Sequence, residues 1–260
     1  MGRTANCLIA AARPRNLGPG GHGGTPEAER HGISNPKDPQ TSPARERYAL
    51  LCDTLRDRIC LLDYPPGTRL SEEALASEFG ISRTPLRRVL GWLESQGLLV
   101  SVQGVGTIVT DVELEELAQV YQLRMELADL IGKLSPLPPD AETVALMRSL
   151  RQRGQKLAAE PDTRSFARLN IEFFHALMRC SGNAPLREIS ERLYYQTTRI
   201  WLKSISHLDL AEEVAIFADE INDVCTAVEL GDIMAAASIR RAHISMSFWR
   251  LGQNGGGPAE

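Results

Sequence analysis

The sequence predicts a mostly α-helical fold with two domains. Residues 67–107 have the pattern of two short helices around a tight turn, followed by a β-hairpin. Beyond residue 111 the strand signals vanish, and helical periodicity continues almost to the end of the chain. A chain of 260 residues is long enough to hold two domains.

The first expected helix runs from about residue 43 to residue 62, and the sequence Tyr64-Pro65-Pro66-Gly67 ends it. Ser71 is the predicted N-cap of the next helix, because its side chain can accept a backbone hydrogen bond and two glutamates follow it. Gly80 then supplies a residue that tolerates the left-handed conformation at the helix end.

The second helix of the pair begins after Ser82, and Gly97 ends it. Its apolar stripe recurs at three- and four-residue spacing: Leu86, Val89, Leu90 and Leu93. Polar residues near its start avoid that stripe: Arg83, Thr84, Arg87 and Arg88. Such arginines most often form a solvated surface. Here they lie where helix-turn-helix proteins contact DNA bases, which favours a DNA-contacting role.

A short hairpin follows this helix. Residues Leu98–Val102 and Thr107–Val109 have the pattern of two strands, and residues 103–106 form the turn between them. A helix pair followed by such a hairpin is typical of a winged helix-turn-helix, which places its second helix in the major groove. We therefore expect a DNA-binding domain over residues 44–110.

Four motifs in this domain occur in a characteristic order and spacing: Pro66-Gly67-Thr68-Arg69-Leu70, Leu75-Ala76, Ser82-Arg83-Thr84-Pro85-Leu86-Arg87 and Leu93-Glu94-Ser95-Gln96-Gly97-Leu98. They resemble the N-terminal domain of the GntR family of bacterial transcription regulators. The resemblance implies that Arg83 and Arg87 contact operator DNA. It also implies that Arg69 reaches the DNA backbone and that Gly106 approaches the minor groove.

Two residues depart from the pattern of that family. Arg88 stands where the family usually has Glu, and it adds positive charge to the predicted DNA face. Val105 stands where the hairpin usually carries Arg, so we expect weaker DNA contacts from the hairpin tip.

Charge and composition differ between the segments. Residues 1–43 are rich in Gly and Pro, and we expect a disordered leader because they cannot bury enough apolar surface. The formal net charge of the chain is −4. Residues 46–110 contain seven Arg and eight Asp or Glu, and three of those arginines start the second helix. This local positive charge favours a sequence-specific DNA reader over a non-specific coat.

The five cysteines are scattered and lack the spacing of metal sites, which predicts reduced thiols in a reducing compartment. No stretch is long and apolar enough to span a membrane. The apolar run from Cys7 to Ala12 is too short for a signal peptide. We therefore expect a cytoplasmic protein.

Six further helices are expected, at residues 112–134, 139–159, 163–180, 184–206, 209–230 and 232–251. Helices joined by such short loops form a bundle, which we assign to residues 111–251, with a flexible tail at 252–260. Residues 111–260 contain 16 Lys or Arg and 22 Asp or Glu, a net charge of −6. We therefore do not expect a second DNA-binding surface here.

Three stretches of the bundle carry a second resemblance: Tyr121-Gln122-Leu123-Arg124; Leu169-Asn170-Ile171-Glu172-Phe173-Phe174-His175-Ala176-Leu177 with Ser181-Gly182-Asn183; and Gly231-Asp232 with Ala235-Ala236-Ala237 and Arg241-Ala242-His243-Ile244. They are similar to the FCD domain of the FadR subgroup of the same family. The resemblance implies a domain that binds a small effector and joins two chains into a homodimer.

Many members of this subgroup hold a divalent metal with one Asp and three His. An ungapped alignment places four residues at those positions: Asn170, Phe174, Ile221 and His243. One imidazole and one amide do not compete for a transition metal, so we expect neither a metal nor another cofactor. His175 lies about 100° around the helix from a ligand position. The alternative is a local bulge that turns His175 inward to join Asp219, Glu220 or Asp223.

Without a metal, an anionic effector needs other positive or hydrogen-bonding groups. The candidates are Arg124, Asn170, Tyr195, Arg199 and His243. Arginine offers a fork of donors that suits a carboxylate, which favours a small organic acid. The alternative is an acyl-CoA or a fatty acid, and a broad apolar channel in the bundle would favour it.

An enzyme is a further alternative, which the sequence does not favour. It contains no glycine-rich phosphate loop, nucleophile elbow, His-Glu-x-x-His motif or paired Cys ligands. The sequence therefore predicts a ligand-responsive regulator, a repressor, that binds a palindromic DNA operator as a homodimer.

Overall fold

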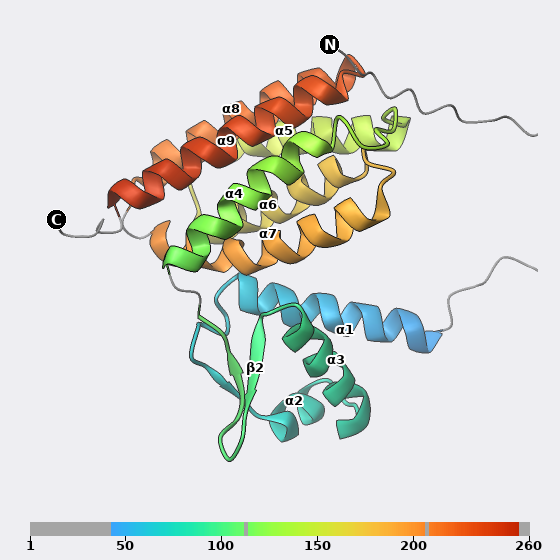
Figure 1. Ribbon diagram of the computed structural model, residues 1–260, viewed down its shortest axis with the longest axis vertical. Coiled ribbons are helices and arrows are strands. Elements are labelled where there is room, and N and C mark those ends of the chain that lie inside the picture. Colours follow the sequence, from blue (N-terminus) through green and yellow to red (C-terminus); the bar gives the residue numbers. More distant parts are fainter. Residues whose placement is uncertain (1–42, 112–113, 206–207, 255–260) are drawn as a thin grey trace, which may run out of the picture. The chain divides into compact units, whose positions relative to one another are not determined.

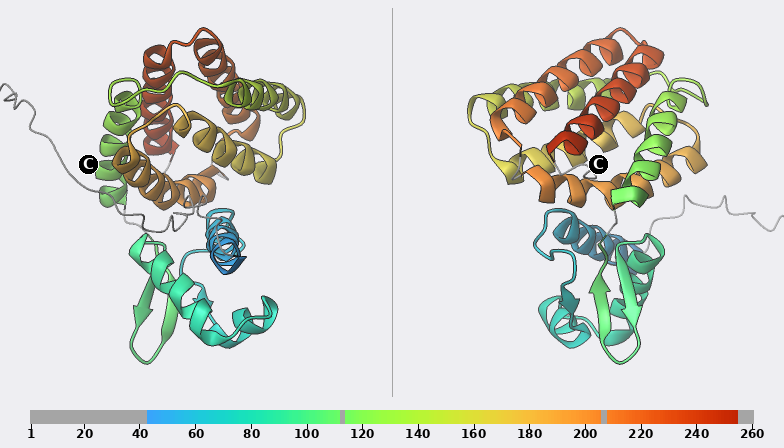
Figure 2. Two further views of the ribbon diagram at one scale, coloured as in Figure 1. Left: turned by 90° about the vertical axis from the view of Figure 1, so that its right-hand side faces the viewer. Right: turned by 60° about the vertical axis from the view of Figure 1, so that its left-hand side comes forward.

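The computed structural model describes residues 43–111, 114–205 and 208–254. Within these ranges the chain forms nine helices and one three-stranded sheet (Figures 1 and 2). The mostly α-helical fold class predicted from the sequence is confirmed. The predicted leader, residues 1–43, lies outside the described residues except for Pro43, which begins the first helix.

The N-terminal part contains three helices and three strands: α1 (Pro43–Cys60), β1 (Arg69–Leu70), α2 (Glu72–Glu78), α3 (Arg83–Ser95), β2 (Leu99–Val102) and β3 (Gly106–Val109). The strands are antiparallel in the order β1-β3-β2. The sequence prediction missed β1, because a strand of two residues is too short for an alternating pattern. Arg69 pairs with Ile108, and Leu70 pairs with Thr107.

The helix ends in this part follow the local sequence. The Ser71 side chain caps α2 by accepting a hydrogen bond from the backbone N–H of Ala74 at 3.3 Å. Gly80 and Gly97 have φ angles of 61° and 74°, the left-handed conformation that glycine adopts most easily. Ser82 lies at the N-cap of α3, but its side chain makes no capping hydrogen bond.

The apolar stripe of α3 holds the helix pair in place. Its four predicted residues are all buried: Leu86, Val89, Leu90 and Leu93. They face α1 and α2, which both contact α3. Because burying a leucine or valine side chain contributes about 1.5–3 kcal/mol, this stripe orients the opposite, polar face of α3 toward solvent.

The C-terminal part is a bundle of six helices: α4 (Leu114–Leu130), α5 (Ala141–Ala159), α6 (Thr163–Met178), α7 (Ala184–Ser204), α8 (Leu210–Glu229) and α9 (Ile233–Asn254). Each one lies within the region predicted from the sequence, to within a few residues at its ends. The last helix extends to residue 254, so residues 252–254 of the predicted tail are helical and residues 255–260 lie outside the described residues.

Short polar side chains begin five of these helices by accepting backbone hydrogen bonds: Asp140, Asp162, Asn183, Asp209 and Asp232. Such caps are typically worth about 1 kcal/mol each. Within the bundle, α4 packs on α9, and α5 packs on α8.

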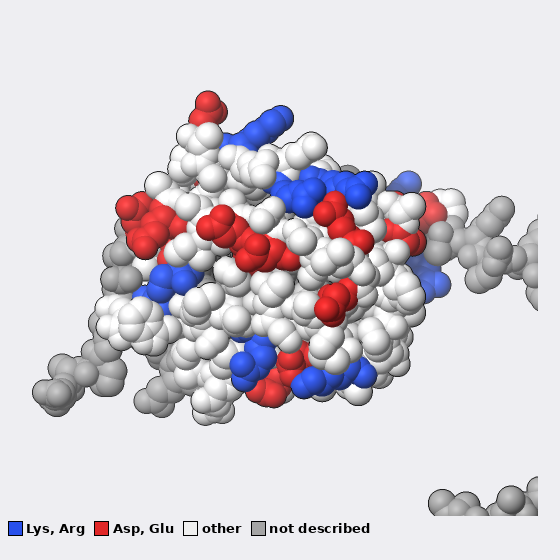
Figure 3. Space-filling view, turned by 90° about the horizontal axis from the view of Figure 1, so that it is seen from above, with Lys and Arg blue, Asp and Glu red and all other residues white. Residues whose placement is uncertain are grey.

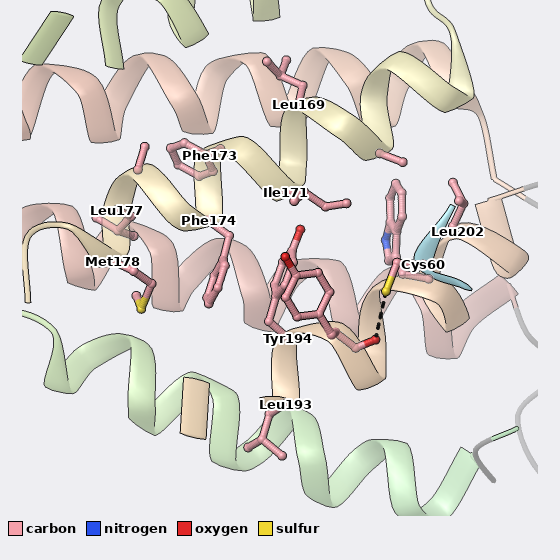
Figure 4. Close-up of a cluster of buried hydrophobic side chains, with 14 of the residues drawn as sticks. Cys60, Leu169, Ile171, Phe173, Phe174, Leu177, Met178, Leu193, Tyr194 and Leu202 are labelled. Atoms are coloured by element: carbon pink, nitrogen blue, oxygen red, sulfur yellow. Dashed lines mark hydrogen bonds between the residues drawn. The ribbon is translucent and has the colours of Figure 1, made fainter. Parts of the chain in front are cut away.

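Aromatic rings fill the centre of the bundle (Figure 4). Phe174 on α6 stacks on Tyr194 of α7, with ring centroids 4.1 Å apart and ring planes 4° from parallel. Phe217 of α8 meets Phe166 and Phe173 edge to face. These contacts fix the spacing between α6, α7 and α8, where a polar cavity lies.

None of the helices in the described ranges has the length and apolar character that a membrane span requires. Figure 3 views the molecule from above, and separate groups of acidic and basic side chains lie on that face among residues of other kinds. The residues described there form no continuous basic surface.

Candidate DNA interface and ligand cavity

Two arginines project from the first turns of α3. The side chains of Arg83 and Arg87 are 59% and 66% exposed. Arg83 lies 3.3 Å from a carboxylate oxygen of Glu73, and Arg87 donates to Glu72 at 2.8 Å. Exposed ion pairs of this kind contribute about 0–1 kcal/mol, so both guanidinium groups can exchange a glutamate for an external acceptor.

The other two polar residues of α3 differ in their surroundings. Thr84 is exposed in the first turn, beside Arg83. Arg88 is also exposed, but its guanidinium lies 5.3 Å from the centre of the Tyr48 ring on α1. The Tyr48 hydroxyl in turn donates to the backbone oxygen of Arg88 at 3.4 Å. The structure therefore directs Arg88 toward α1.

The small sheet brings Arg69 and Gly106 together. They lie on the adjacent strands β1 and β3, and a Cβ atom added to Gly106 would lie 3.3 Å from Nε of Arg69. Gly106 has a φ angle of 117°, which a larger residue adopts only with strain. Val105 at the hairpin tip is 41% exposed. A glycine at this point leaves room for the Arg69 side chain.

A cavity of about 60 Å³ lies within the helical bundle. Its lining residues come from α4, α6, α7, α8 and α9: Tyr121, Arg124, Phe166, Asn170, Tyr194, Thr198, Trp201, Glu213, Ile216, Phe217, Glu220, Arg240, His243, Ile244, Ser247 and Arg250. Three of the five effector residues predicted from the sequence are among them, namely Arg124, Asn170 and His243.

One buried and one partly buried ion pair form part of the cavity wall. Arg240 of α9 donates to Glu220 of α8 at 2.5 Å, and their side chains are 9% and 5% exposed. Burial alone lowers the pKa of Arg240, but the Glu220 carboxylate outweighs burial and raises it. Arg250 makes two hydrogen bonds to Glu213, at 2.5 and 2.9 Å. Each glutamate of the wall is therefore matched by an arginine.

Arg124 is the third arginine of the cavity wall, and its partners are neutral. Its guanidinium donates to the Thr197 hydroxyl at 2.7 Å. It also lies 5.1 Å and 5.4 Å from the ring centres of Tyr121 and Tyr194. Within the described ranges, no carboxylate forms an ion pair with Arg124. Burial lowers the pKa of its guanidinium, and the charge of Arg240 lowers it further.

Asn170 and His243 complete the polar part of the wall. The side-chain oxygen of Asn170 accepts a hydrogen bond from the Tyr194 hydroxyl at 3.1 Å. His243 has a side chain that is 16% exposed, and its Nδ1 lies 3.9 Å from a carboxylate oxygen of Glu220. Both residues can offer a hydrogen bond to a molecule in the cavity.

The positions aligned with metal ligands do not suit a transition metal. The Phe174 ring stacks on the Tyr194 ring, and Ile221 is fully buried beside Gly154 of α5. Asn170 offers an amide oxygen that already accepts a hydrogen bond. In the described part of the chain, no three His, Cys, Asp or Glu side chains gather in an arrangement that could hold a metal ion. These donors therefore do not fit the group that the family resemblance implies.

His175 points away from the cavity. Its Nε2 lies 2.6 Å from the Tyr195 hydroxyl, and burial lowers its pKa. Glu220, one of the proposed partners of His175 in a metal site, pairs with Arg240 instead. The alternative of an inward-turned His175 is therefore not supported by these contacts.

Tyr195 and Arg199 do not line the cavity, unlike the other predicted effector residues. Arg199 is fully buried and donates to the backbone oxygen of Leu98 at 3.3 Å and to the Thr110 hydroxyl at 2.6 Å. Arg56 of α1 lies 4.0 Å above the Tyr195 ring. Residues four apart share one face of a helix, and this face of α7 contacts the N-terminal part.

The sequence reasoning missed Glu213, Arg240 and Arg250, and it considered Glu220 only as a possible metal partner of His175. The sequence of α8 does contain a pattern that indicates the two glutamates. Glu213, Phe217 and Glu220 recur at helical spacing along one buried face. A carboxylate inside an apolar stripe needs a buried cation, and α9 supplies one for each glutamate.

Comparisons with known proteins agree with this architecture. Residues 47–109 match the gntR family of bacterial regulatory proteins, and residues 119–246 match the FCD domain. The chain is 30% identical over 199 residues to the "Uncharacterized HTH-type transcriptional regulator in unstable DNA locus" of Streptomyces ambofaciens, covering 75% of this chain and 80% of the relative.

A second relative and a solved structure extend the comparison. The "Probable D-xylose utilization operon transcriptional repressor" of Paenarthrobacter nicotinovorans is 26% identical over 195 residues, which cover 74% of this chain and 83% of the relative. The fold resembles E. coli McbR/YncC with a TM-score of 0.70 at 20% identity, covering 81% of this chain and 99% of the other. The chain therefore belongs to the gntR family of bacterial regulatory proteins, with a winged helix-turn-helix followed by an FCD domain.

Proposed function

We propose that this regulator represses transcription by binding a palindromic operator as a homodimer, and that a small carboxylate in the bundle cavity modulates its affinity. We assign DNA binding to residues 44–110 and effector binding with dimerisation to residues 111–251, as in the FadR subgroup. The observation that carries the proposal is the position of α7. One face of α7 lines the cavity, and another face contacts the DNA-binding domain.

For DNA recognition we assign base contacts to Arg83, Thr84 and Arg87, at the exposed start of α3. A dimer with two such helices suits an operator with two half-sites. Arg69 and Gly106 lie side by side in the sheet, so we assign them to backbone and minor-groove contacts. Arg88 contributes positive charge near the DNA, while its guanidinium lies over the Tyr48 ring.

For the effector, the size and polarity of the cavity favour a small acid over the acyl-chain alternative. Its volume is about 60 Å³, far below the 300–1,000 Å³ of pockets that hold drug-sized molecules. A neighbouring cavity with a mainly apolar lining has only about 20 Å³. Neither has room for the acyl chain of a fatty acid or of an acyl-CoA.

Helix α7 offers a route from the cavity to the DNA-binding domain. Thr197 contacts Arg124 of the cavity wall. The next residue toward the N-terminus, Gln196, donates to the backbone oxygen of Gln96 at 2.8 Å, just beyond α3. An effector that moves α7 therefore shifts contacts at the end of the recognition helix.

The outer face of α9 supports a homodimer through the helical domain. Between residues 234 and 249 its exposed positions recur at helical spacing and are small or apolar except for Arg241: Met234, Ser238, Arg241, Ala242, Ser245, Met246 and Trp249. Trp249 is 66% exposed, and large exposed apolar residues that cluster mark interaction surfaces. We expect the exchange of Trp249 for Glu to weaken dimerisation, as measured by light scattering.

The name of the D-xylose relative supports repression as the mode of action. The family and the relatives are transcription regulators, which supports a regulatory role over an enzymatic one. A DNA-binding role also supports a location in the cytoplasm, where the chromosome lies. Selection of an operator from random DNA, followed by fluorescence anisotropy with and without small carboxylates, tests the proposal. No selected sequence, or an affinity that no carboxylate changes, contradicts it.

A further inference from the structure

We propose that Arg124 anchors a small monocarboxylate in the bundle cavity, in the role that a metal ion fills in related FCD domains. The inference rests on the proposed effector function and specifies its ligand class. Its basis is the charge inventory, the volume and the polar groups of the cavity wall.

Among the wall residues that the structure describes, one positive charge has no counter-ion. Glu213 and Glu220 are each hydrogen-bonded to an arginine, Arg250 and Arg240. Among the described residues, the partners of Arg124 are a hydroxyl group and two aromatic rings. Three guanidinium groups and two carboxylates leave a net charge of +1, which one monoanion neutralises.

A guanidinium cannot remove this imbalance by losing its proton, since its pKa stays far above neutral pH in proteins. A hydroxyl and two ring faces compensate a cation only in part, because cation–π contacts are weaker than a charge-assisted hydrogen bond. A carboxylate offers two oxygens that match the fork of the guanidinium. Arg124 is therefore built to receive an anion from outside the chain.

The cavity limits what else the anion can carry. A volume of about 60 Å³ suits a small ligand and is far below that of pockets for drug-sized molecules. Asn170 and His243 can hydrogen-bond a hydroxyl or keto group on the ligand. A second carboxylate would face Glu213 and Glu220, so a dicarboxylate is disfavoured.

The same geometry explains how a ligand without a metal could signal. The Arg124 guanidinium already donates to Thr197 on α7, and a bound carboxylate competes for its donors. Thr197 is buried and also donates to backbone oxygens of its own helix. Anion binding therefore acts directly on the helix that contacts the DNA-binding domain.

Calorimetric titration of the full chain tests the proposal. The probes are acetate, propionate, glycolate, lactate and pyruvate, with succinate, octanoate and zinc chloride for comparison. We expect at least one of the five monocarboxylates to bind, and to bind more tightly than succinate and octanoate. The Arg124→Met variant should bind that probe about 10- to 100-fold more weakly, as for a lost hydrogen bond to a charged group.

Arg153→Met is the matched control, because Arg153 is an exposed arginine of the bundle that pairs with Glu172. It should bind the probe as the natural chain does. If Arg124→Met misfolds by circular dichroism, Arg124→Lys replaces it. Lysine keeps the charge but lacks the planar fork, and it should also weaken binding.

Equal affinity in the folded Arg124 variant, preference for succinate or octanoate, or stoichiometric zinc binding would each overturn the proposal. Operator binding distinguishes it from the proposed function. If a monocarboxylate binds through Arg124 without changing operator affinity, the ligand class stands and the regulatory function fails. If octanoate alone changes operator affinity, the regulatory function stands and this inference fails.

Discussion

The arginines of α3 and those of the bundle cavity make similar ion pairs in opposite surroundings. Arg87 pairs with Glu72 at 2.8 Å while its side chain is 66% exposed. Arg240 pairs with Glu220 at 2.5 Å while its side chain is 9% exposed. Water screens the first pair, but protein atoms surround the second.

This difference separates arginines that can exchange partners from arginines that cannot. An exposed pair gains little free energy, so a phosphate or a guanine edge can replace the glutamate. Removing one partner of a buried pair leaves a charge without water or a counter-ion, which costs several kcal/mol. Surface pairs therefore suit DNA binding, and the buried pairs fix the cavity wall.

The largest effect that tests this comparison is expected at Glu220. Exchange of Glu220 for Gln leaves Arg240 buried without its carboxylate, and should lower the free energy of unfolding by about 3–5 kcal/mol. Urea denaturation monitored by circular dichroism measures the loss. Glu172→Gln is the control, because that pair with Arg153 is exposed and should cost less than about 1 kcal/mol. Equal losses in the two variants would remove the distinction.

The next effect concerns the exposed arginines. Arg83→Ala and Arg87→Ala should each weaken operator binding by about 1–3 kcal/mol and relax the base preference at one position. Neither should change the free energy of unfolding by more than about 1 kcal/mol, because both pairs are exposed. Fluorescence anisotropy on a panel of operator variants gives the binding part.

Arg69→Ala provides the comparison within the DNA-binding domain. We expect this substitution to weaken binding to all DNA sequences alike. It should also reduce the dependence of affinity on salt concentration, as for a lost phosphate contact. Unchanged operator affinity in both α3 variants would refute their assignment to base contacts.

The same contrast explains what could be predicted from the sequence. The α3 stripe, the Ser71 cap and the order of the helices follow from local patterns, and the structure agrees with them. The glutamate partners of Arg83 and Arg87 lie on the adjacent helix α2. They could not be predicted, because exposed ion pairs leave no periodic pattern in the sequence.

The cavity was predicted only in part, because it depends on which faces of distant helices meet. Arg124, Asn170 and His243 share it, but Arg199 lies on the opposite side of its helix and contacts Leu98. No local sequence pattern distinguishes the face of α7 that lines the cavity from the face that carries Arg199. The pairing of α8 glutamates with α9 arginines likewise requires knowing that these helices pack together.

A partly buried group that can lose its charge, such as His175, should behave differently from both kinds of arginine. Burial lowers the pKa of His175, whose ring meets the Tyr195 hydroxyl and lies near the charges of Glu191, Arg56 and Asp53. In the unfolded chain the imidazole binds its proton near pH 6.5. The unfolded state therefore holds more protons below that pH, and stability should fall as pH decreases from 7.5 through 6.5.

His175→Gln should reduce this pH dependence while leaving a hydrogen-bonding group beside Tyr195. Urea denaturation at several pH values between 5.5 and 7.5 measures both chains. An identical pH dependence in the two would show that other groups control stability in this range.

The smallest effect is expected at Glu72, the surface partner of Arg87. Exchange of Glu72 for Gln should change the free energy of unfolding by less than about 1 kcal/mol, because the pair is exposed to water. Operator affinity should rise modestly for two reasons. Arg87 no longer has to break an ion pair before it contacts DNA, and the negative charge of Glu72 no longer repels the DNA phosphates. Anisotropy at two salt concentrations should show a larger gain at low salt. A loss of operator affinity would mean that Glu72 positions Arg87 for its base, and that this exposed pair is as fixed as the buried ones.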